Sequence, residues 1–193
     1  MSKHTIPLPN NPKRHQEMDG RPQHLRGLWY SAESKRKELD NAYDSNSSSF
    51  QENLLSAITT YEECVRVADQ VSLFSPNEAL EDISSGDIQY MVISYHLAEL
   101  IQRLNSSDRK ANLDRARLQY EKFLKLLDSY DILSKADVRL FEQYTENRNR
   151  FSTASTTDAA ARRETKISRF RTEKELKQQL EVRPSNASRL CEY

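Results

Sequence analysis

Glycine and proline are scarce in the main part of this 193-residue chain. The sequence has three glycines and six prolines, and only Gly86 and Pro76 lie between Leu28 and Val182. Tight β-hairpins depend on glycine and Asn-Gly turns, so a β-rich or α/β fold would have too few turn residues. The sequence therefore predicts an all-α protein, and its length suits one domain with a sizeable core plus tails.

The chain also has few cysteines and a formal net charge of zero. Two cysteines, Cys64 and Cys191, give no disulfide framework and no metal-binding pattern. The 29 basic and 29 acidic residues cancel, whereas a dedicated nucleic-acid-binding domain is usually basic. There is no apolar N-terminal signal region and no segment of membrane-spanning length. We therefore expect a reduced, cytoplasmic protein that could also enter the nucleus, with neither nucleic acid nor membrane as a partner.

Hydrophobic periodicity divides the chain into about six helices between two polar ends. We expect residues 1–22 to form a flexible tail, residues 23–182 a helical domain, and residues 183–193 a disordered end. Short connections favour antiparallel neighbours, but no clean 34-residue repeat is present, which indicates an irregular α-solenoid or bundle. The expected helices cover residues 23–43, 50–71, 88–104, 113–127, 138–144 and 158–181. Ser49, Asn105–Ser107 and Thr157 are the expected caps of the second, fourth and last helices.

The stretch from Leu73 to Leu104 contains a turn followed by a helix that is apolar on two faces. Pro76 marks the turn, and Ser84 stands three residues before Asp87, a spacing that resembles a capping box. Two apolar stripes predict that neighbouring helices cover this helix on both sides. The first stripe contains Ile88, Met91, Val92, Tyr95, Ala98 and Ile101, and the second Tyr90, Ile93, Leu97, Leu100 and Leu104.

No catalytic pattern is present in the sequence. It lacks a glycine-rich phosphate loop, an HExxH motif and a GxSxG motif. His96 can pair with Glu99, three residues later on the same helix, which favours a structural role. The acidic residues Glu78, Glu81, Asp82 and Asp87 could bind a cation weakly, but helix-start electrostatics explains them better. We therefore expect a protein that is not an enzyme, with no catalytic, metal-binding or cofactor-binding residues.

The last helix carries a basic face. Arg163 and Lys166 are three residues apart and project from neighbouring positions, and Phe170 follows one turn later. Arginine can bind a carboxylate with two hydrogen bonds, lysine adds a mobile charge, and the aromatic ring supplies dry contact area. Spacing alone does not separate such a surface from an ordinary solvated helix face.

Two segments resemble the Tap-forty-two/alpha-four family of type 2A phosphatase-associated proteins. One is LFSPNEALEDIS followed by GDIQYMVISYHLAELI, and the other is RRETKISRFRTEKELKQQLE, over residues 162–181. They occur in the order found in that family's N-terminal domain, and the resemblance covers roughly residues 23–181. Family members usually continue into a largely unstructured C-terminal region beyond the point where this chain ends.

The resemblance implies both a fold and a function. It implies an irregular, tetratricopeptide-like antiparallel stack and a non-catalytic regulator that binds and shelters catalytic subunits of type 2A, 4 and 6 phosphatases in TOR signalling. The family's contact includes an Arg-x-x-Lys pair before an isoleucine, which matches Arg163 and Lys166 before Ile167. The resemblance therefore implies that these two residues bind the partner. Phe170, one turn further along the helix, is the candidate for the apolar part of that contact. Arg162, Arg169 and Lys174 are the expected helpers.

Other functions remain open on the residues alone. The chain could be a helical-repeat scaffold that binds extended or phosphorylated peptides in a concave groove. Its last helix could instead be a coiled-coil or RNA-binding arm, although its apolar spacing is irregular and it lacks base-stacking aromatics. We expect a monomeric phosphatase-binding adaptor.

Overall fold

The computed structural model describes residues 20–153 and 158–182. Over these residues it contains six α-helices and no strand, which confirms the all-α prediction. The chain divides into two compact units, Met1–Ser134 and Lys135–Tyr193, and each unit is described by itself.

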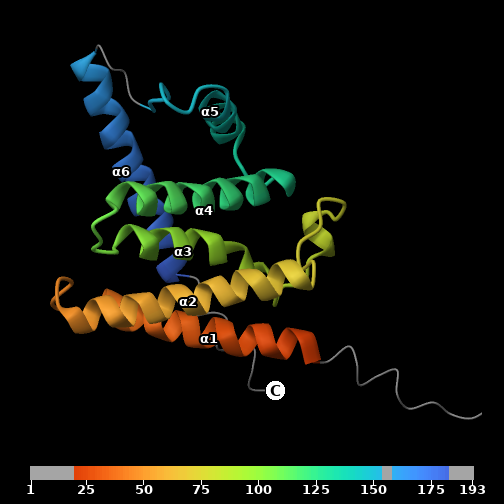
Figure 1. Ribbon diagram of the computed structural model, residues 1–193. Helices are drawn as coiled ribbons and strands as arrows, with labels where there is room; N and C mark the ends of the chain where they lie inside the picture. The colour runs from red at the N-terminus through yellow and green to blue at the C-terminus, as the bar shows by residue number, and fades with distance from the viewer. Residues whose placement is uncertain (1–19, 154–157, 183–193) are drawn as a thin grey trace, which may run out of the picture. The chain divides into compact units, whose positions relative to one another are not determined.

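The first unit is an antiparallel stack of four helices (Figure 1). These are α1 (Gly20–Asp40), α2 (Ser48–Gln70), α3 (Ile93–Gln102) and α4 (Arg109–Ser129). α3 packs against α2 on one side and α4 on the other. The prediction that this helix is covered on two faces is therefore confirmed.

The helix starts lie close to the expected positions, but different residues cap them. Ser47, rather than Ser49, precedes α2, and its side-chain oxygen accepts a hydrogen bond of 3.2 Å from the Phe50 N–H. Asp108 caps α4 by accepting a 2.9 Å hydrogen bond from the Ala111 N–H. Each cap satisfies an amide group that the first helical turn leaves without a partner.

The prediction for the start of the third helix was partly wrong. A 3₁₀ turn, Ile88–Val92, precedes the α-helical residues, and Ile88 is 44% exposed although the apolar pattern placed it in a buried stripe. The Ser84 hydroxyl donates to the Asp87 carboxylate at 2.8 Å instead of capping the helix. In a 3₁₀ turn three residues, not 3.6, complete one turn, so Ile88 no longer lines up with the stripe that follows.

Two helices end in a left-handed residue that is not glycine. At the end of α2, Ser72 has φ 48°, and the Leu73 N–H donates to the Ala68 carbonyl at 3.0 Å. At the end of α4, Asp131 has φ 53°, and the Ile132 N–H donates to the Leu127 carbonyl at 2.9 Å. Both are Schellman motifs, whose left-handed position usually holds glycine.

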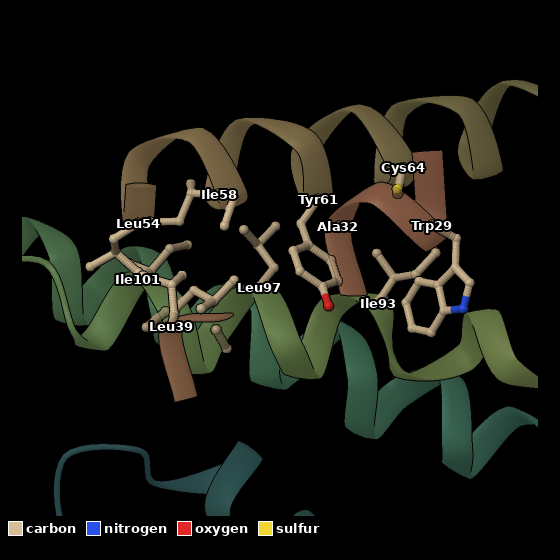
Figure 2. Close-up of a cluster of buried hydrophobic side chains, with 14 of the residues drawn as sticks. Trp29, Ala32, Leu39, Leu54, Ile58, Tyr61, Cys64, Ile93, Leu97 and Ile101 are labelled. Carbon is tan, nitrogen blue, oxygen red and sulfur yellow. The ribbon is translucent and has the colours of Figure 1, made fainter. Parts of the chain in front are cut away.

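The core of the first unit lies between α1, α2 and α3 (Figure 2). Aliphatic residues fill one end of it, and Trp29 contacts Tyr61 and Tyr90 edge-on at the other, with ring centroids 6.1 and 5.8 Å apart. Burial raises the pKa of the Cys64 thiol to about 12. The residues with no more than 2% exposure include Leu25, Ala32, Leu54, Ala57, Ile58, Tyr61, Cys64, Leu97, Ala98, Leu100 and Ile101.

The turn before the third helix is fixed by a residue from the end of α4. The Tyr130 hydroxyl accepts a hydrogen bond from the Ser75 N–H at 3.0 Å and donates one to the Ser75 carbonyl at 2.9 Å. The rings of Phe74 and Tyr130 meet edge-on, with centroids 6.2 Å apart. Because Tyr130 is buried, these contacts hold the turn against the stack.

The second unit contains α5 (Lys135–Glu146) and α6 (Ala159–Val182). Its aromatic residues form a small cluster, in which Phe141 stacks on Tyr144 and Tyr144 meets Phe151 edge-on. No side chain described in either helix is fully buried. This unit therefore presents most of its side chains at its surface.

Candidate functional site

The six predicted partner-binding residues all lie on α6. The Asp158 carboxylate starts this helix by accepting hydrogen bonds from the N–H groups of Ala160, at 2.8 Å, and Ala161, at 3.2 Å. An aspartate at this position also complements the positive end of the helix dipole. The predicted cap, Thr157, lies outside the described residues.

Four of the six residues form one row along α6. Arg163, Lys166, Phe170 and Lys174 are separated by three, four and four residues, which places them on the same face of a helix. All four side chains are exposed, and Phe170 is 68% exposed. The row is about 16 Å long, at 1.5 Å per residue.

Arg162 and Arg169 form a second row beside the first. They are seven residues apart, so both lie at nearly the same angle around the helix, and Arg162 is about 100° from Arg163. Both side chains are exposed. Together the two rows make a broad basic surface around one large apolar side chain.

Arg163 and Lys166, the central pair of this surface, form no ion pair with any residue that the structure describes. Lys177, further along α6, pairs with Glu173 at 2.6 Å, and this hydrogen bond raises the pKa of Lys177. Within the described ranges, neither Arg163 nor Lys166 has a carboxylate within ion-pairing distance. Both cations can therefore bind an acidic partner without first breaking an internal ion pair.

Sequence reasoning missed a half-buried polar cluster where α1, α2 and α3 of the first unit meet. Glu33 and Arg36, one turn apart on α1, form two hydrogen bonds of 2.8 and 3.1 Å. The Tyr61 hydroxyl from α2 donates a further bond to Glu33. Burial alone would raise the pKa of Glu33, but the hydrogen bonds from Arg36 and Tyr61 outweigh it and hold the pKa below 4.5. Helical apolar spacing shows which residues face inward, but not which polar groups of separate helices meet.

His96 joins this cluster from α3. Its Nε2 lies 3.7 Å from Glu33 Oε1 and its Nδ1 lies 3.5 Å from Glu99 Oε2, which confirms the expected pair with Glu99. The Glu99 contact is not a hydrogen bond, and Nδ1 has no hydrogen-bond partner in the described part of the chain. Burial, with a contribution from the Arg36 charge, lowers the pKa of His96 below 6.5. The cluster is held by packing against Trp29 and Tyr61, which favours a structural role for it.

The acidic residues before α3 do not form a metal site in the described part of the chain. Among the described residues, no group of three or more His, Cys, Asp or Glu side chains is placed to hold a metal ion. In the acidic segment before α3, Asp82 instead accepts a 2.9 Å hydrogen bond from the Ala79 N–H. None of the helices described is both long and apolar enough to cross a membrane.

The chain is similar in sequence to several known proteins. An uncharacterized protein of Schizosaccharomyces pombe is 31% identical over 114 residues, covering 58% of this chain and 32% of that protein. A rice protein named PP2A regulatory subunit TAP46 is 25% identical over 130 residues, covering 67% of this chain and 29% of its own length. The type 2A phosphatase-associated protein 42 of Saccharomyces cerevisiae is 28% identical over 135 residues, covering 59% and 36%. This chain thus spans about a third of the length of these relatives.

The family match extends further along the chain than these pairwise similarities. The model of the TAP42-like family matches residues 25–190, a range that contains α2–α4, all but the first five residues of α1, and the basic surface of α6. The chain therefore belongs to the TAP42-like family.

Proposed function

We propose that this protein is a non-catalytic regulator that binds the catalytic subunit of a type 2A-like protein phosphatase and shelters it from degradation. Its partners would be the catalytic subunits of type 2A, 4 and 6 phosphatases, and it would act in TOR signalling. The observation that carries this proposal is the TAP42-like family match, which includes α6. The names of the rice and yeast relatives give the same class of partner.

The proposed contact is the α6 surface centred on Arg163 and Lys166. Both side chains are exposed and have no ion-pair partner within the described residues, so acidic groups on the phosphatase can bind them. Phe170, 68% exposed and on the same row, would supply the apolar centre of the contact. Arg162, Arg169 and Lys174 would surround it with further positive charge.

The direct test is capture of purified type 2A, 4 and 6 catalytic subunits by the immobilised chain. We expect R163E/K166E to weaken binding by about tenfold or more, because it replaces two attractive charges by repulsive ones. R171E is the control for reversing one charge on this helix, since Arg171 is also exposed on α6 but lies about 80° around the helix from Arg163. Both variants should keep the helical circular dichroism of the native chain.

Two results would contradict different parts of the proposal. Native-like capture by R163E/K166E would exclude the α6 site, and failure of the unmodified chain to capture any of the three subunits would exclude the function. Sheltering is tested by the half-life of the catalytic subunit in cells after protein synthesis is stopped. R163E/K166E should shorten that half-life relative to R171E, and the purified chain should not hydrolyse phosphopeptides above the buffer background.

A further inference from the structure

A pocket of about 470 Å³ lies in the first unit, where the turn before α3 meets the ends of α2 and α4. This volume is within the range of pockets that bind small molecules or peptide side chains. Every lining residue comes from residues 65–130, so the pocket belongs to one unit and includes no part of α6. The LFSPNE segment, which the sequence indicated as a turn and a family marker, contributes Phe74, Ser75 and Pro76 to its wall.

The floor of the pocket is apolar and well packed. Tyr90, Met91, Ile93 and Tyr130 line it, and each is no more than 4% exposed. Leu126 from α4 adds to the same surface. A large apolar side chain placed here would exchange water for contact with a rigid hydrophobic surface.

The wall of the pocket is held in place before any ligand binds. The two hydrogen bonds between Tyr130 and the backbone of Ser75 fix the turn, and the Schellman motif at Ser72 fixes the end of α2. A preformed wall does not have to be ordered on binding, so less of the binding free energy is lost.

The rim of the pocket is basic on the α4 side. Lys122 and Lys125 are three residues apart on α4, line the pocket and are exposed. Lys122 forms a long ion pair with Asp69, at 3.9 Å, and within the described residues Lys125 has no ion-pair partner. Asp69 also lines the pocket, so two cations face one carboxylate and the rim keeps an excess of positive charge that suits an acidic ligand.

Hydroxyl groups add hydrogen-bonding capacity beside the apolar floor. Ser72 and Ser94 line the pocket from different segments, and within the part of the chain that is described neither hydroxyl makes a hydrogen bond. A peptide that enters the pocket brings amide N–H and C=O groups that need such partners. A simple hydrocarbon chain would leave them unused.

We propose that this pocket binds a short acidic peptide segment of a partner protein, with a bulky apolar side chain as its anchor. The anchor lies on Tyr90, Met91 and Ile93, and a carboxylate one or two residues away pairs with Lys122 or Lys125. The proposal does not depend on the phosphatase contact, because none of the lining residues is on α6.

The test is fluorescence polarisation of labelled ten-residue peptides titrated with the full chain. The reference peptide has one phenylalanine between glutamates; in a second peptide alanine replaces the phenylalanine, and in a third lysines replace the glutamates. We expect the reference peptide to bind, and each altered peptide to bind about tenfold more weakly or worse.

Variants of the chain locate the binding site. K122E/K125E should weaken the reference peptide about fivefold or more, whereas K110E/R117E, a charge-matched change of exposed α4 residues outside the pocket, should not. S94F should fill the pocket and remove binding, with its thermal unfolding checked to confirm that it folds. R163E/K166E should bind the peptide like the native chain, so failure of the phosphatase contact and failure of this site are distinguishable.

Several results would overturn the proposal. These are no binding of the reference peptide, equal binding of the alanine peptide, or equal weakening by K122E/K125E and K110E/R117E. Competition by decanoate as strong as that by unlabelled peptide would assign the pocket to a fatty acid. Self-association of the chain that S94F abolishes would assign it to a second copy.

Discussion

The Tyr130 hydroxyl hydrogen-bonds both the N–H and the carbonyl of Ser75, a residue 55 positions earlier in the chain. One side chain thus satisfies both backbone polar groups of Ser75, which in a helix or strand would bond to other backbone groups. The contact joins the end of α4 to the start of the segment that leads to α3.

Replacing Tyr130 by phenylalanine should destabilise the first unit by about 1–3 kcal/mol, because the Ser75 N–H and carbonyl lose their partner while the ring still packs. Urea unfolding followed by circular dichroism measures the loss. Tyr43→Phe is the control, since Tyr43 is fully exposed and its hydroxyl should contribute nothing. Equal midpoints for the two variants would show that the Tyr130 bonds do not stabilise the fold.

Replacing Ser72 by glycine should stabilise the chain by about 0.5–1 kcal/mol. The left-handed conformation strains a residue that has a Cβ atom, and the relief exceeds the extra backbone entropy that glycine loses on folding. Ser72→Ala is the comparison, because alanine keeps the Cβ atom and should give no gain. A glycine variant no more stable than the alanine variant in urea would contradict the assignment of strain at φ 48°.

His96 should make stability fall on mild acidification. Burial lowers its pKa in the folded state below 6.5, with a further contribution from Arg36. The unfolded chain therefore binds more protons as the pH falls below about 6.5, and the free energy of unfolding falls by at most about 1.4 kcal/mol per pH unit. Glu33 contributes separately at lower pH, since its own pKa lies below 4.5.

The measurement is urea unfolding of the native chain and of His96→Gln at pH 7.5 and pH 5.5. The native chain should lose more stability than the variant between these values, because glutamine does not titrate. Equal losses would show that another group causes the dependence.

Phosphatase capture through α6 should depend on salt. Raising the NaCl concentration from about 0.05 to 0.5 M shortens the screening length and should weaken capture by the native chain several-fold. Phe170→Ala should weaken capture at both concentrations and leave the salt dependence unchanged, since it removes only apolar contact. Capture insensitive to salt would indicate an interface without Arg163 and Lys166.

Much of the fold could be predicted from the sequence because helical spacing directly reports which residues face inward. The buried residues Ile93, Leu97, Leu100 and Ile101 all belong to the predicted stripes of the third helix. The prediction that Ile88 is buried was wrong, because a 3₁₀ turn changes the angle between successive residues. The spacing of apolar residues along one helix does not reveal that change.

The candidate sites differ in how far the sequence could predict them. The α6 row lies on one helix, so its spacing alone groups Arg163, Lys166 and Phe170. The pocket combines Val65, Phe74, Tyr90 and Lys122 from separate segments, and the Glu33–Tyr61 bond joins two helices. Such groupings depend on how helices pack, which a local pattern does not specify.

The packing of Trp29 gives this protein a built-in optical probe. Trp29 is the sole tryptophan of the chain, is 6% exposed, and contacts rings from α2, from the 3₁₀ turn and from α3. Its emission therefore reports on whether α1 is seated on its neighbours, without any attached dye. Movement of that one helix can therefore be followed in real time in the unmodified chain. A ligand without tryptophan can be added without contributing to the signal.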